Sequence, residues 1–288
     1  MRGHRPMNVS ALPRLLVEPI VRRALEEDLG RSGDVTTEAV VPNDAVTTAL
    51  MNAREPGVVA GLDCAAIAFE LVDAALDVAV LVEDGARVST GDGLLKAQGS
   101  AQAVLTAERV ALNFVGRLSG VATLTRAYVD AVAHTQAKIA DTRKTTPGLR
   151  ALEKRAVRLG GGSNHRFGLD DALLIKDNHI AAGGGVTAVL KRARDWAGHM
   201  LTIEIEVDTL EQLDEALAAD VAQNILLDNM TLDQMRQAVA LTAGRATLEA
   251  SGGVSLETVA AIAETGVDYI SSGALTHSAK TLDIGLDF

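Results

Sequence analysis

The sequence predicts an α/β protein whose C-terminal half forms a parallel barrel, either closed or nearly closed. The main observation is a rhythm that starts near residue 137, where short aliphatic runs alternate with amphipathic helical segments. Such alternation is typical of parallel strands that are buried on both faces. In addition, 48% of the residues are hydrophobic and only 2% are aromatic, which indicates a large aliphatic core. Six or slightly more strand–helix units favour a barrel, and a doubly wound open sheet is the structural alternative.

The N-terminal half carries a different pattern. A helical spacing that ends at a glycine is followed by short β-like runs between glycine-rich turns. The expected elements in chain order are a helix at 15–29 that ends at Gly30, strands at 45–53 and 76–82, and a turn cluster at 83–93. A longer helical pattern covers 100–133, and Gly116 and Gly120 are predicted to divide it into two helices.

Six aliphatic runs predict the strands of the barrel. They are, in chain order, AKIA (137–140), ALLI (172–175), LTIEIEV (201–207), NILL (224–227), ATLEA (246–250) and DYIS (268–271). Helix starts between them are indicated by capping-box spacings, in which Asp208 precedes Glu211 and Thr231 precedes Gln234 by three residues. The segments between the runs are therefore expected to be helices that cover the strands.

Composition and charge exclude several classes of function. The formal net charge of -11 and the scarcity of aromatic side chains argue against nucleic acid as a partner. No apolar run reaches the length of a membrane span, and the N-terminus lacks the apolar region of a secretory signal. Cys64 is the only cysteine, which excludes a disulfide framework and a cysteine-rich metal site and indicates a cytoplasmic protein. Its helix-like apolar surroundings indicate a core residue.

Polar residues or glycines follow every one of the six runs. In a parallel barrel the carboxyl ends of the strands meet on one face, where active sites lie. The residues at these ends are Asp141, Thr142, Arg143 and Lys144; Lys176, Asp177, Asn178 and His179; Glu206 and Asp208; Asp228 and Asn229; Ser251, Gly252 and Gly253; and Ser272 and Gly273. Solvated loops rarely give so complete a set, so these positions predict a ligand site.

Basic residues gather in the segment 138–176, where nine lysines and arginines stand against four acidic residues. The helical stretch 149–160 is interpreted as a solvated face, with Glu153 beside its cations. The other cations lie at strand ends or in the glycine-rich segment 160–168; with the neighbouring histidine they are Arg143, Lys144, His165, Arg166 and Lys176. Several fixed cations in one pocket require an anionic ligand, and arginine favours planar carboxylates.

Two charged residues beside this cluster keep more than one interpretation. Asp141 is expected to orient Arg143 or Lys176, and the sequence does not decide between them. Arg150 is assigned to a helix surface or a subunit contact, with a secondary role in anion binding as the alternative.

Two neighbouring strand ends are suited to phosphate. Ser251, Gly252 and Gly253 follow one strand, and Ser272 and Gly273 follow the next. Glycine lets the main chain approach a ligand, and the N–H groups before a helix attract anions. The last strands of a parallel barrel are also where a phosphate site is commonest. The sequence therefore predicts a phosphate cradle here.

Glu206 and Asp228 place carboxylates at two consecutive strand ends. Carboxylate oxygens suit Mg²⁺ or the hydroxyls of a sugar, and Mg²⁺ would also hold phosphates. The alternative for Glu206 is an exposed pair with a lysine. Glu204 lies two residues before Glu206 on the same predicted strand. Because side chains alternate along a strand, it is expected to point to the same face from a deeper position.

Several of these stretches together resemble a known family. The motifs that carry the resemblance are TAERVALNFVGRLSGVATLT, DTRKTTPGLR, GGGSNHRFGLDDALLIKDNHI, EIEVDTLEQLDEAL, ILLDNM, EASGGV and SSGALTH. They are similar to those of quinolinate phosphoribosyltransferase, also called carboxylating nicotinate-nucleotide pyrophosphorylase, in order from about residue 15 to the end. The resemblance implies an incomplete parallel α/β barrel with an N-terminal α/β sandwich-like domain. It places the N-terminal domain at 1–120, the barrel at 121–277, and a tail at 278–288 on the former.

The resemblance also implies a reaction. Quinolinate and phosphoribosyl pyrophosphate would yield nicotinate mononucleotide, pyrophosphate and CO₂ with Mg²⁺, in the de novo synthesis of NAD. The implied enzyme is a homodimer or a higher oligomer that binds neither nucleic acid nor membrane. In each dimer, Arg109 resembles the arginine that reaches the neighbouring subunit's active site.

The residues that match the family's site fall into three groups. Arg143, His165, Arg166 and Lys176 resemble the residues that bind the two quinolinate carboxylates, while Thr142 and Lys144 resemble residues at the substrates. Glu206 and Asp228 resemble the carboxylates at the ribose hydroxyls and the metal, with a catalytic role that Lys144 shares. Ser251, Gly252, Gly253, Ser272, Gly273 and Ala274 resemble the cradle of the 5′-phosphate.

Two departures from the family pattern and two competing functions are noted. The loop 218–228 is about one residue longer than the pattern, and Ser271 stands where a small apolar residue is more common. One competing function is a phosphoribosyltransferase for a related aromatic acid, although a monocarboxylate needs fewer cations. The other is a non-catalytic phosphometabolite-binding protein, which loss of Glu206 or Asp228 would have favoured.

Overall fold

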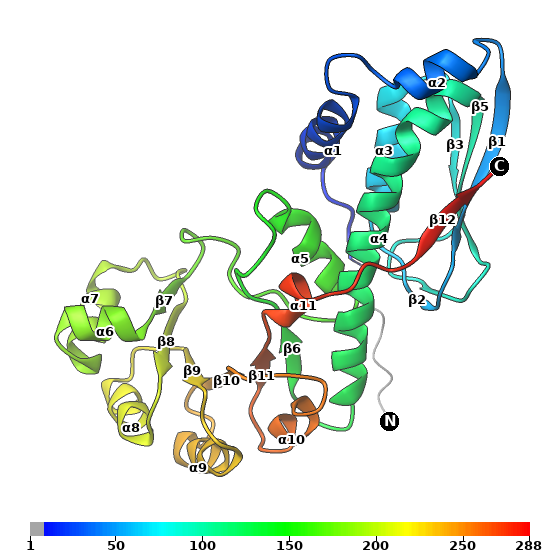
Figure 1. Cartoon of the computed structure of the whole chain (residues 1–288). Helices are drawn as coiled ribbons and strands as arrows, with labels where there is room; N and C mark the ends of the chain where they lie inside the picture. The colour runs from blue at the N-terminus through cyan, green and yellow to red at the C-terminus, as the bar shows by residue number, and fades with distance from the viewer. Residues whose placement is uncertain (1–8) are drawn as a thin grey trace. The chain divides into compact units, whose positions relative to one another are not determined.

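The computed structural model describes residues 9–288, which form two compact units (Figure 1). Within the described range, the first unit contains 9–126, 146–161 and 278–288, and the second contains 127–145 and 162–277. The described residues include no helix that is long and apolar enough to cross a membrane.

The first unit is built on an antiparallel sheet with the strand order β12-β1-β5-β3. Its strands are β1 (Val46–Ala53), β3 (Asp77–Val80), β5 (Gly93–Ser100) and β12 (Ile284–Asp287), with a small separate pair β2 (Gly57–Val58) and β4 (Arg87–Val88). Its helices include α1 (Arg14–Leu29), α2 (Val35–Val40) and α3 (Leu62–Val72). The helix at 15–29, its end at Gly30 and both predicted strands are confirmed. Cys64 is fully buried in α3, so its assignment to the core is also confirmed.

Residues Ala101–Ala131 form one continuous helix, α4, so the predicted division at Gly116 and Gly120 is wrong. The two glycines serve a close approach of the C-terminal segment instead. A Cβ at Gly120 would overlap the carbonyl oxygen of Lys280, and one at Gly116 would lie 2.8 Å from Cγ2 of Thr281. The main-chain N–H of Leu282 donates to the carbonyl of Gly116 over 3.0 Å. The glycines therefore let the chain that leads to β12 lie directly on the helix.

Helix α5 (Arg150–Leu159) belongs to the first unit, and its interpretation as a solvated face is wrong. Glu153 is fully buried and Lys154 nearly so. The Glu153 carboxylate accepts hydrogen bonds from Arg117 Nη2 at 2.8 Å and from the main-chain N–H of Thr146 at 2.9 Å. Arg155 likewise donates to carboxylates of the same unit. A charge run within one helix does not reveal such partners, because they come from distant segments.

The second unit is a six-stranded parallel sheet with the order β6-β11-β10-β9-β8-β7. The strands are β6 (Lys138–Ala140), β7 (Leu173–Ile175), β8 (Ile203–Val207), β9 (Asn224–Asp228), β10 (Thr247–Ser251) and β11 (Tyr269–Ser271), which confirms all six predictions. From β7 to β11 consecutive strands are neighbours, and the last strand, β11, pairs with the first, β6, as in a barrel rather than a doubly wound sheet. Ser163 bridges to Ala140 on the free side of β6. Among the described residues the pairing ends there and at β7, so the barrel is incomplete.

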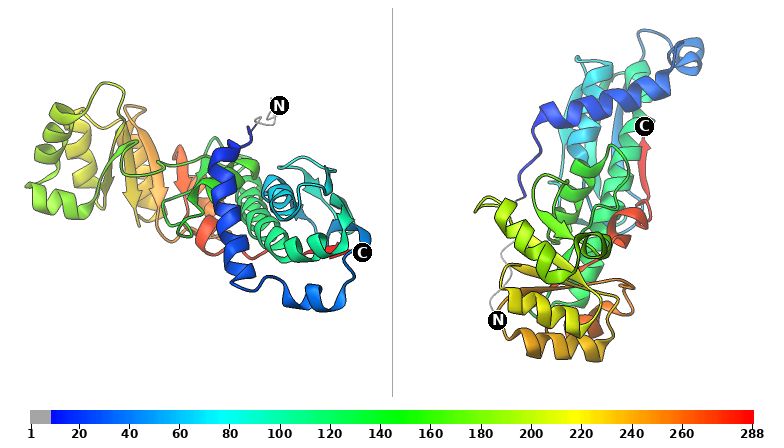
Figure 2. Two further views of the ribbon diagram at one scale, coloured as in Figure 1. Left: turned by 90° about the horizontal axis from the view of Figure 1, so that it is seen from above. Right: turned by 90° about the vertical axis from the view of Figure 1, so that its left-hand side faces the viewer.

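Most helices of the second unit lie along the outer face of its strands (Figures 1 and 2). These are α6 (Asp177–Gly183), α7 (Val186–Trp196), α8 (Leu210–Ala219), α9 (Leu232–Thr242) and α10 (Val259–Ala263), whereas the short α11 (Ala274–His277) follows the carboxyl end of β11. The capping box at Thr231 and Gln234 is confirmed at the start of α9. The N-cap of α8 is Thr209 rather than Asp208, because the Thr209 hydroxyl accepts the N–H of Gln212. The predicted capping box there is wrong by one residue.

Substitution of Gly120 by alanine is expected to destabilise the first unit. In an open helix the same change would stabilise by about 1 kcal/mol, but here the new methyl group overlaps the carbonyl of Lys280. The expected loss in the free energy of unfolding is about 1–3 kcal/mol or more. Urea unfolding of Gly120→Ala checks this. Gly198→Ala is the matched control, since open space surrounds that position. Equal stability of both variants would contradict the proposed contact.

Candidate active site

The carboxyl ends of the parallel strands bring the predicted site residues to one edge of the sheet. The strand register places Ser251 of β10 beside Asp228 of β9, and Glu206 of β8 beside Leu226 of β9. Because side chains alternate along a strand, Glu206 and Asp228 point to the same face of the sheet. Lys176 follows β7, and Arg143 and Lys144 follow β6.

Lys176 and Glu206 form an ion pair between neighbouring strand ends. The Glu206 side chain is 11% exposed and that of Lys176 is 44% exposed. The partner of Glu206 is therefore a lysine, as the alternative interpretation held, but this lysine is itself one of the predicted site cations. The pair lies at the mouth of the barrel rather than on an outer surface.

Asp141 is fully buried and holds the segment that contains His165. Its Oδ2 accepts from Asn164 Nδ2 at 2.6 Å, and its Oδ1 accepts from the main-chain N–H of His165 at 2.8 Å. Its own N–H donates to the carbonyl of Ser163, which extends the sheet beyond β6. Asp141 thus fixes the 163–166 segment, a role that its predicted pairing with Arg143 or Lys176 did not include.

Arg143 and Arg166 each bring a buried guanidinium Nε that has no hydrogen-bond partner among residues 9–288. Arg166 uses its Nη1 to donate to the carbonyl of Ala172 at 3.0 Å. Burial, and then the nearby charge of Arg143, lower the pKa of Arg166. Two like charges near each other with unsatisfied N–H groups are suited to an anion that would pair with both.

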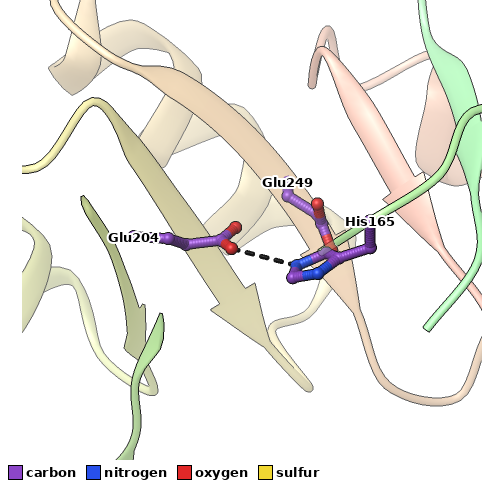
Figure 3. A group of neighbouring side chains, drawn as sticks. All are labelled: His165, Glu204 and Glu249. Carbon is purple, nitrogen blue, oxygen red and sulfur yellow. Dashed lines mark ion pairs between the residues drawn. The ribbon is translucent and has the colours of Figure 1, made fainter. Parts of the chain in front are cut away.

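His165, Glu204 and Glu249 form a buried cluster inside the barrel (Figure 3). Nε2 of His165 lies 2.9 Å from Oε2 of Glu204 and 3.8 Å from Oε1 of Glu249. Burial, together with the charge of Glu204, raises the pKa of Glu249 to about 7. Glu249 was not predicted from the sequence because it lies within β10 rather than after it. A carboxylate inside an otherwise aliphatic strand was the signal that could have identified it.

A cavity of about 320 Å³ lies beside this cluster and is lined by His165, Arg166 and Glu204 among others. Its lining also includes Asn224 and Thr247, the first residues of β9 and β10. The cavity therefore extends toward the amino ends of the strands, away from Glu206 and Asp228. It is a polar interior space that shares His165 and Arg166 with the predicted site, while Glu206 and Asp228 are not among its lining residues.

The residues predicted to hold phosphate lie at the ends of β10 and β11. Gly252 and Gly253 both have positive φ angles, 90° and 61°, which favour glycine. A Cβ at Gly252 would overlap the Asn229 side chain, and one at Gly273 would lie 2.8 Å from Cδ of Lys144. Lys144 thus lies beside the loop after β11, where the Ser272 hydroxyl accepts the N–H of Ala274 at 3.3 Å.

The remaining predicted residues have separate positions. The Thr142 hydroxyl accepts the main-chain N–H of Lys144 at 3.0 Å and so shapes the loop after β6. Arg109 lies on α4 in the first unit, where it is exposed. Arg150 is the first residue of α5 and is half-buried, also in the first unit.

Comparisons with known proteins point to one family along nearly the whole chain. Residues 34–119 match the family described as quinolinate phosphoribosyl transferase, N-terminal domain, and residues 121–287 match the corresponding C-terminal domain. The chain is 54% identical to a carboxylating nicotinate-nucleotide pyrophosphorylase of Mycobacterium leprae, over 93% of this chain and 95% of the relative. It is 45% identical to a probable enzyme of the same name in Bacillus subtilis, over 95% and 93% respectively.

Solved structures agree with these relatives. The crystal structure of NadC from Streptococcus pyogenes is 43% identical, with a TM-score of 0.93 over 97% of this chain and 98% of that one. An α/β unit with an antiparallel sheet and a parallel, incomplete barrel are thus the architecture that this chain shares with it.

The raised pKa of Glu249 predicts a stability that falls as the pH rises. Between about pH 4.5 and 7 the folded protein binds more protons at this carboxyl than the unfolded chain does, so the advantage is complete below this window and lost above it. The loss is on the order of 3 kcal/mol. Glu249→Gln, which mimics the protonated form, is expected to remove this part of the decline. Urea unfolding of both proteins at about pH 5 and about pH 8 measures it. A decline of the same size in both would refute the assignment.

Proposed function

Because the chain belongs to the quinolinate phosphoribosyltransferase family, we propose that its strand-end residues bind quinolinate and phosphoribosyl pyrophosphate and direct their reaction. The protein is an enzyme of NAD biosynthesis, a carboxylating nicotinate-nucleotide pyrophosphorylase. The assignment of individual residues to the two substrates, the metal and the assembly are the parts that we propose.

The observation that carries the assignment is the pair of buried Nε atoms of Arg143 and Arg166, which have no hydrogen-bond partner among residues 9–288. Quinolinate has two neighbouring carboxylates, and a planar guanidinium pairs well with a planar carboxylate. Lys176 lies at the next strand end and adds a third positive charge. A ligand with a single carboxylate would leave one of the arginines unpaired, which is costly in a buried site.

Phosphoribosyl pyrophosphate is assigned to the opposite side of the strand-end face. The glycines 252 and 253 and the loop after β11 leave main-chain N–H groups for the 5′-phosphate. Lys144 lies beside Gly273 and is suited to the pyrophosphate charge. Glu206 and Asp228 lie on β8 and β9, between Lys176 after β7 and the glycine-rich loop after β10, where they would face the ribose.

The donor set also fits Mg²⁺. Glu206 and Asp228 are hard oxygen ligands on the same face of adjacent strands. Lys176 already pairs with Glu206, so Asp228 is the more available of the two carboxylates. When bound, Mg²⁺ would supply positive charge to the phosphates of phosphoribosyl pyrophosphate, with Asp228 and Glu206 as its protein ligands.

In the proposed mechanism the protein acts by positioning and by charge. The quinolinate nitrogen forms a bond to the anomeric carbon as the bond from that carbon to pyrophosphate breaks. Glu206 and Asp228 stabilise the positive charge that develops on the ribose, and Lys144 the negative charge on the leaving group. The ring nitrogen then carries positive charge, so the bond to the 2-carboxylate breaks with release of CO₂. Its electron pair stays on the ring carbon, which takes up a proton.

The active assembly is proposed to be a homodimer. Its support is the resemblance of Arg109 to the arginine by which this family completes a neighbouring active site. Arg109 is exposed on α4, as such a role requires. Arg109 of the partner subunit would add positive charge to each site. The cytoplasmic location stays a prediction from the sequence.

The substrate assignment is tested by release of CO₂. With phosphoribosyl pyrophosphate and Mg²⁺, the protein is expected to consume quinolinate and release CO₂ and pyrophosphate in equal amounts. Nicotinate should give less than about one hundredth of the rate, because a buried arginine is left unpaired. Comparable pyrophosphate release from nicotinate would instead support an enzyme for a related aromatic acid, and binding without turnover would support a phosphometabolite-binding protein.

Arg166→Ala is expected to weaken quinolinate binding by at least about 100-fold, since a buried charge-assisted pair is removed. Binding of phosphoribosyl pyrophosphate should change little. Calorimetry with each ligand measures both, and Arg236→Ala serves as the control because Arg236 lies on the exposed face of α9. Equal loss of both ligands would count against the assignment of Arg166.

Shared active sites predict complementation between inactive chains. Arg109→Ala and Arg143→Ala should each be nearly inactive. After mixing and subunit exchange, hybrid dimers contain one site with both arginines intact, so about one quarter of the wild-type activity is expected to return by random assortment. The activity of the mixture is compared with that of each variant alone. No recovery, with subunit exchange shown by mass, would argue for sites built from one chain.

A further inference from the structure

Asn229 joins the end of β9 to the glycine-rich loop after β10. Its main-chain N–H donates to the carbonyl of Ser251 over 2.9 Å and so continues the pairing of these two strands. Its side-chain Nδ2 donates to Oδ2 of Asp228 over 2.8 Å. The other side of the same amide lies against Gly252, where a Cβ would overlap Oδ1 of Asn229. One side chain therefore contacts both a carboxylate assigned to the ribose and the loop assigned to the 5′-phosphate.

The main chain at Asn229 has an uncommon conformation. Its φ angle is 52°, in the left-handed region that disfavours most side chains but tolerates asparagine. Among residues 9–288, the other non-glycine residues with positive φ are Asp220 and Ala243, which are the C-caps of α8 and α9. Those two positions follow from the way helices end. Asn229 instead follows a strand, at the point where the predicted site lies.

The carboxylate of Asp228 has little else to orient it. It is half-buried, and within the described part of the chain the Asn229 amide is the only hydrogen-bond partner of its side chain. The amide occupies Oδ2 and leaves Oδ1 for a ligand. An amide N–H is a neutral donor, so it orients the carboxylate without cancelling its charge. That charge is what a positive ribose requires.

We propose that Asn229 is a positioning residue for phosphoribosyl pyrophosphate: its amide holds the Asp228 carboxylate in one orientation and at a set spacing from the Gly252 loop. The inference rests on the proposed function in naming this substrate. The ribose hydroxyls and the 5′-phosphate belong to one molecule, so covalent bonds fix the distance between them. The protein groups that bind them must keep a matching distance, because a misplacement of about 1 Å can cost about 100-fold in rate.

The same contact accounts for the glycine at 252. Its φ angle of 90° favours glycine, and the Asn229 amide fills the space that a side chain would need. The loop after β10 can therefore lie close against the residue that orients Asp228. The spacing between carboxylate and loop is set by this contact and by the main-chain hydrogen bond to Ser251.

Two substitutions separate the amide from the turn. Asn229→Gly keeps the left-handed turn and removes the amide, while Asn229→Asp keeps its size and removes the donor. Each is expected to weaken phosphoribosyl pyrophosphate, measured by calorimetry with Mg²⁺, by at least about 10-fold and to lower kcat about 10-fold to 100-fold. Quinolinate affinity should stay within about threefold of wild type. Asparagine that served the turn alone would leave Asn229→Gly with wild-type affinity for both substrates, and that result would overturn the proposal.

Ala243→Gly is the matched control for the main chain. It makes the same kind of change at an exposed left-handed position at the end of α9, so both affinities and kcat should be unchanged. Thermal unfolding of all three variants shows whether each is folded. Weakening of quinolinate to the same extent as phosphoribosyl pyrophosphate in both Asn229 variants would indicate a general loss of structure and would also overturn the proposal.

A second readout needs no substrate. In crystal structures without ligand, the Asp228 side chain is expected to have one rotamer in the wild type and more than one in Asn229→Gly. The same single rotamer in both would contradict the positioning role. Failure of the wild type to bind phosphoribosyl pyrophosphate would refute the proposed function instead, and the rotamers of Asp228 would still decide whether Asn229 orients it.

Discussion

The buried carboxylate of Asp141 is the constraint on which the site depends. A buried charge is tolerated only when its oxygens are satisfied, and Asp141 accepts from Asn164 and from the main chain of His165. These hydrogen bonds join the end of β6 to a segment more than twenty residues later in the chain. They hold the 163–166 segment beside the end of β6, so that Arg166 stays near Arg143 although the two like charges disfavour each other.

The same principle recurs in the interior of the barrel. Glu204 and Glu249 are buried carboxylates on β8 and β10, and the ring of His165 lies against both (Figure 3). Burial of an ionised carboxylate destabilises the folded protein, and the same burial raises the pKa of Glu249. Such groups are retained where they serve function, and here they stand directly behind the cations of the strand-end face. The barrel therefore carries a polar layer beneath the proposed substrate site.

The parallel sheet brings together the charged groups that the reaction needs. Parallel strands bring their carboxyl ends to one edge, so cations, carboxylates and glycine-rich loops from six strands meet without any long excursion of the chain. The catalytic demand is charge placement, because the reaction passes through a positive ribose and expels a negative pyrophosphate. Rigid strand ends meet that demand, and the ion pair of Lys176 with Glu206 shows opposite charges already placed side by side.

The sequence by itself determined the six strands, their parallel arrangement, the burial of Cys64 and the family, because periodicity and local motifs carry that information. It also identified the residues that follow each strand. Only the tertiary structure decided the partners of buried charges: Glu153 with Arg117, Asp141 with the His165 segment, and Glu204 with the His165 ring. The tertiary structure also decided that α4 is a single helix. Gly116 and Gly120 do not break it, because they are there to make room for the C-terminal segment that packs on the helix. Local patterns report local geometry, whereas the burial of a charge or a glycine depends on what the folded chain brings against it.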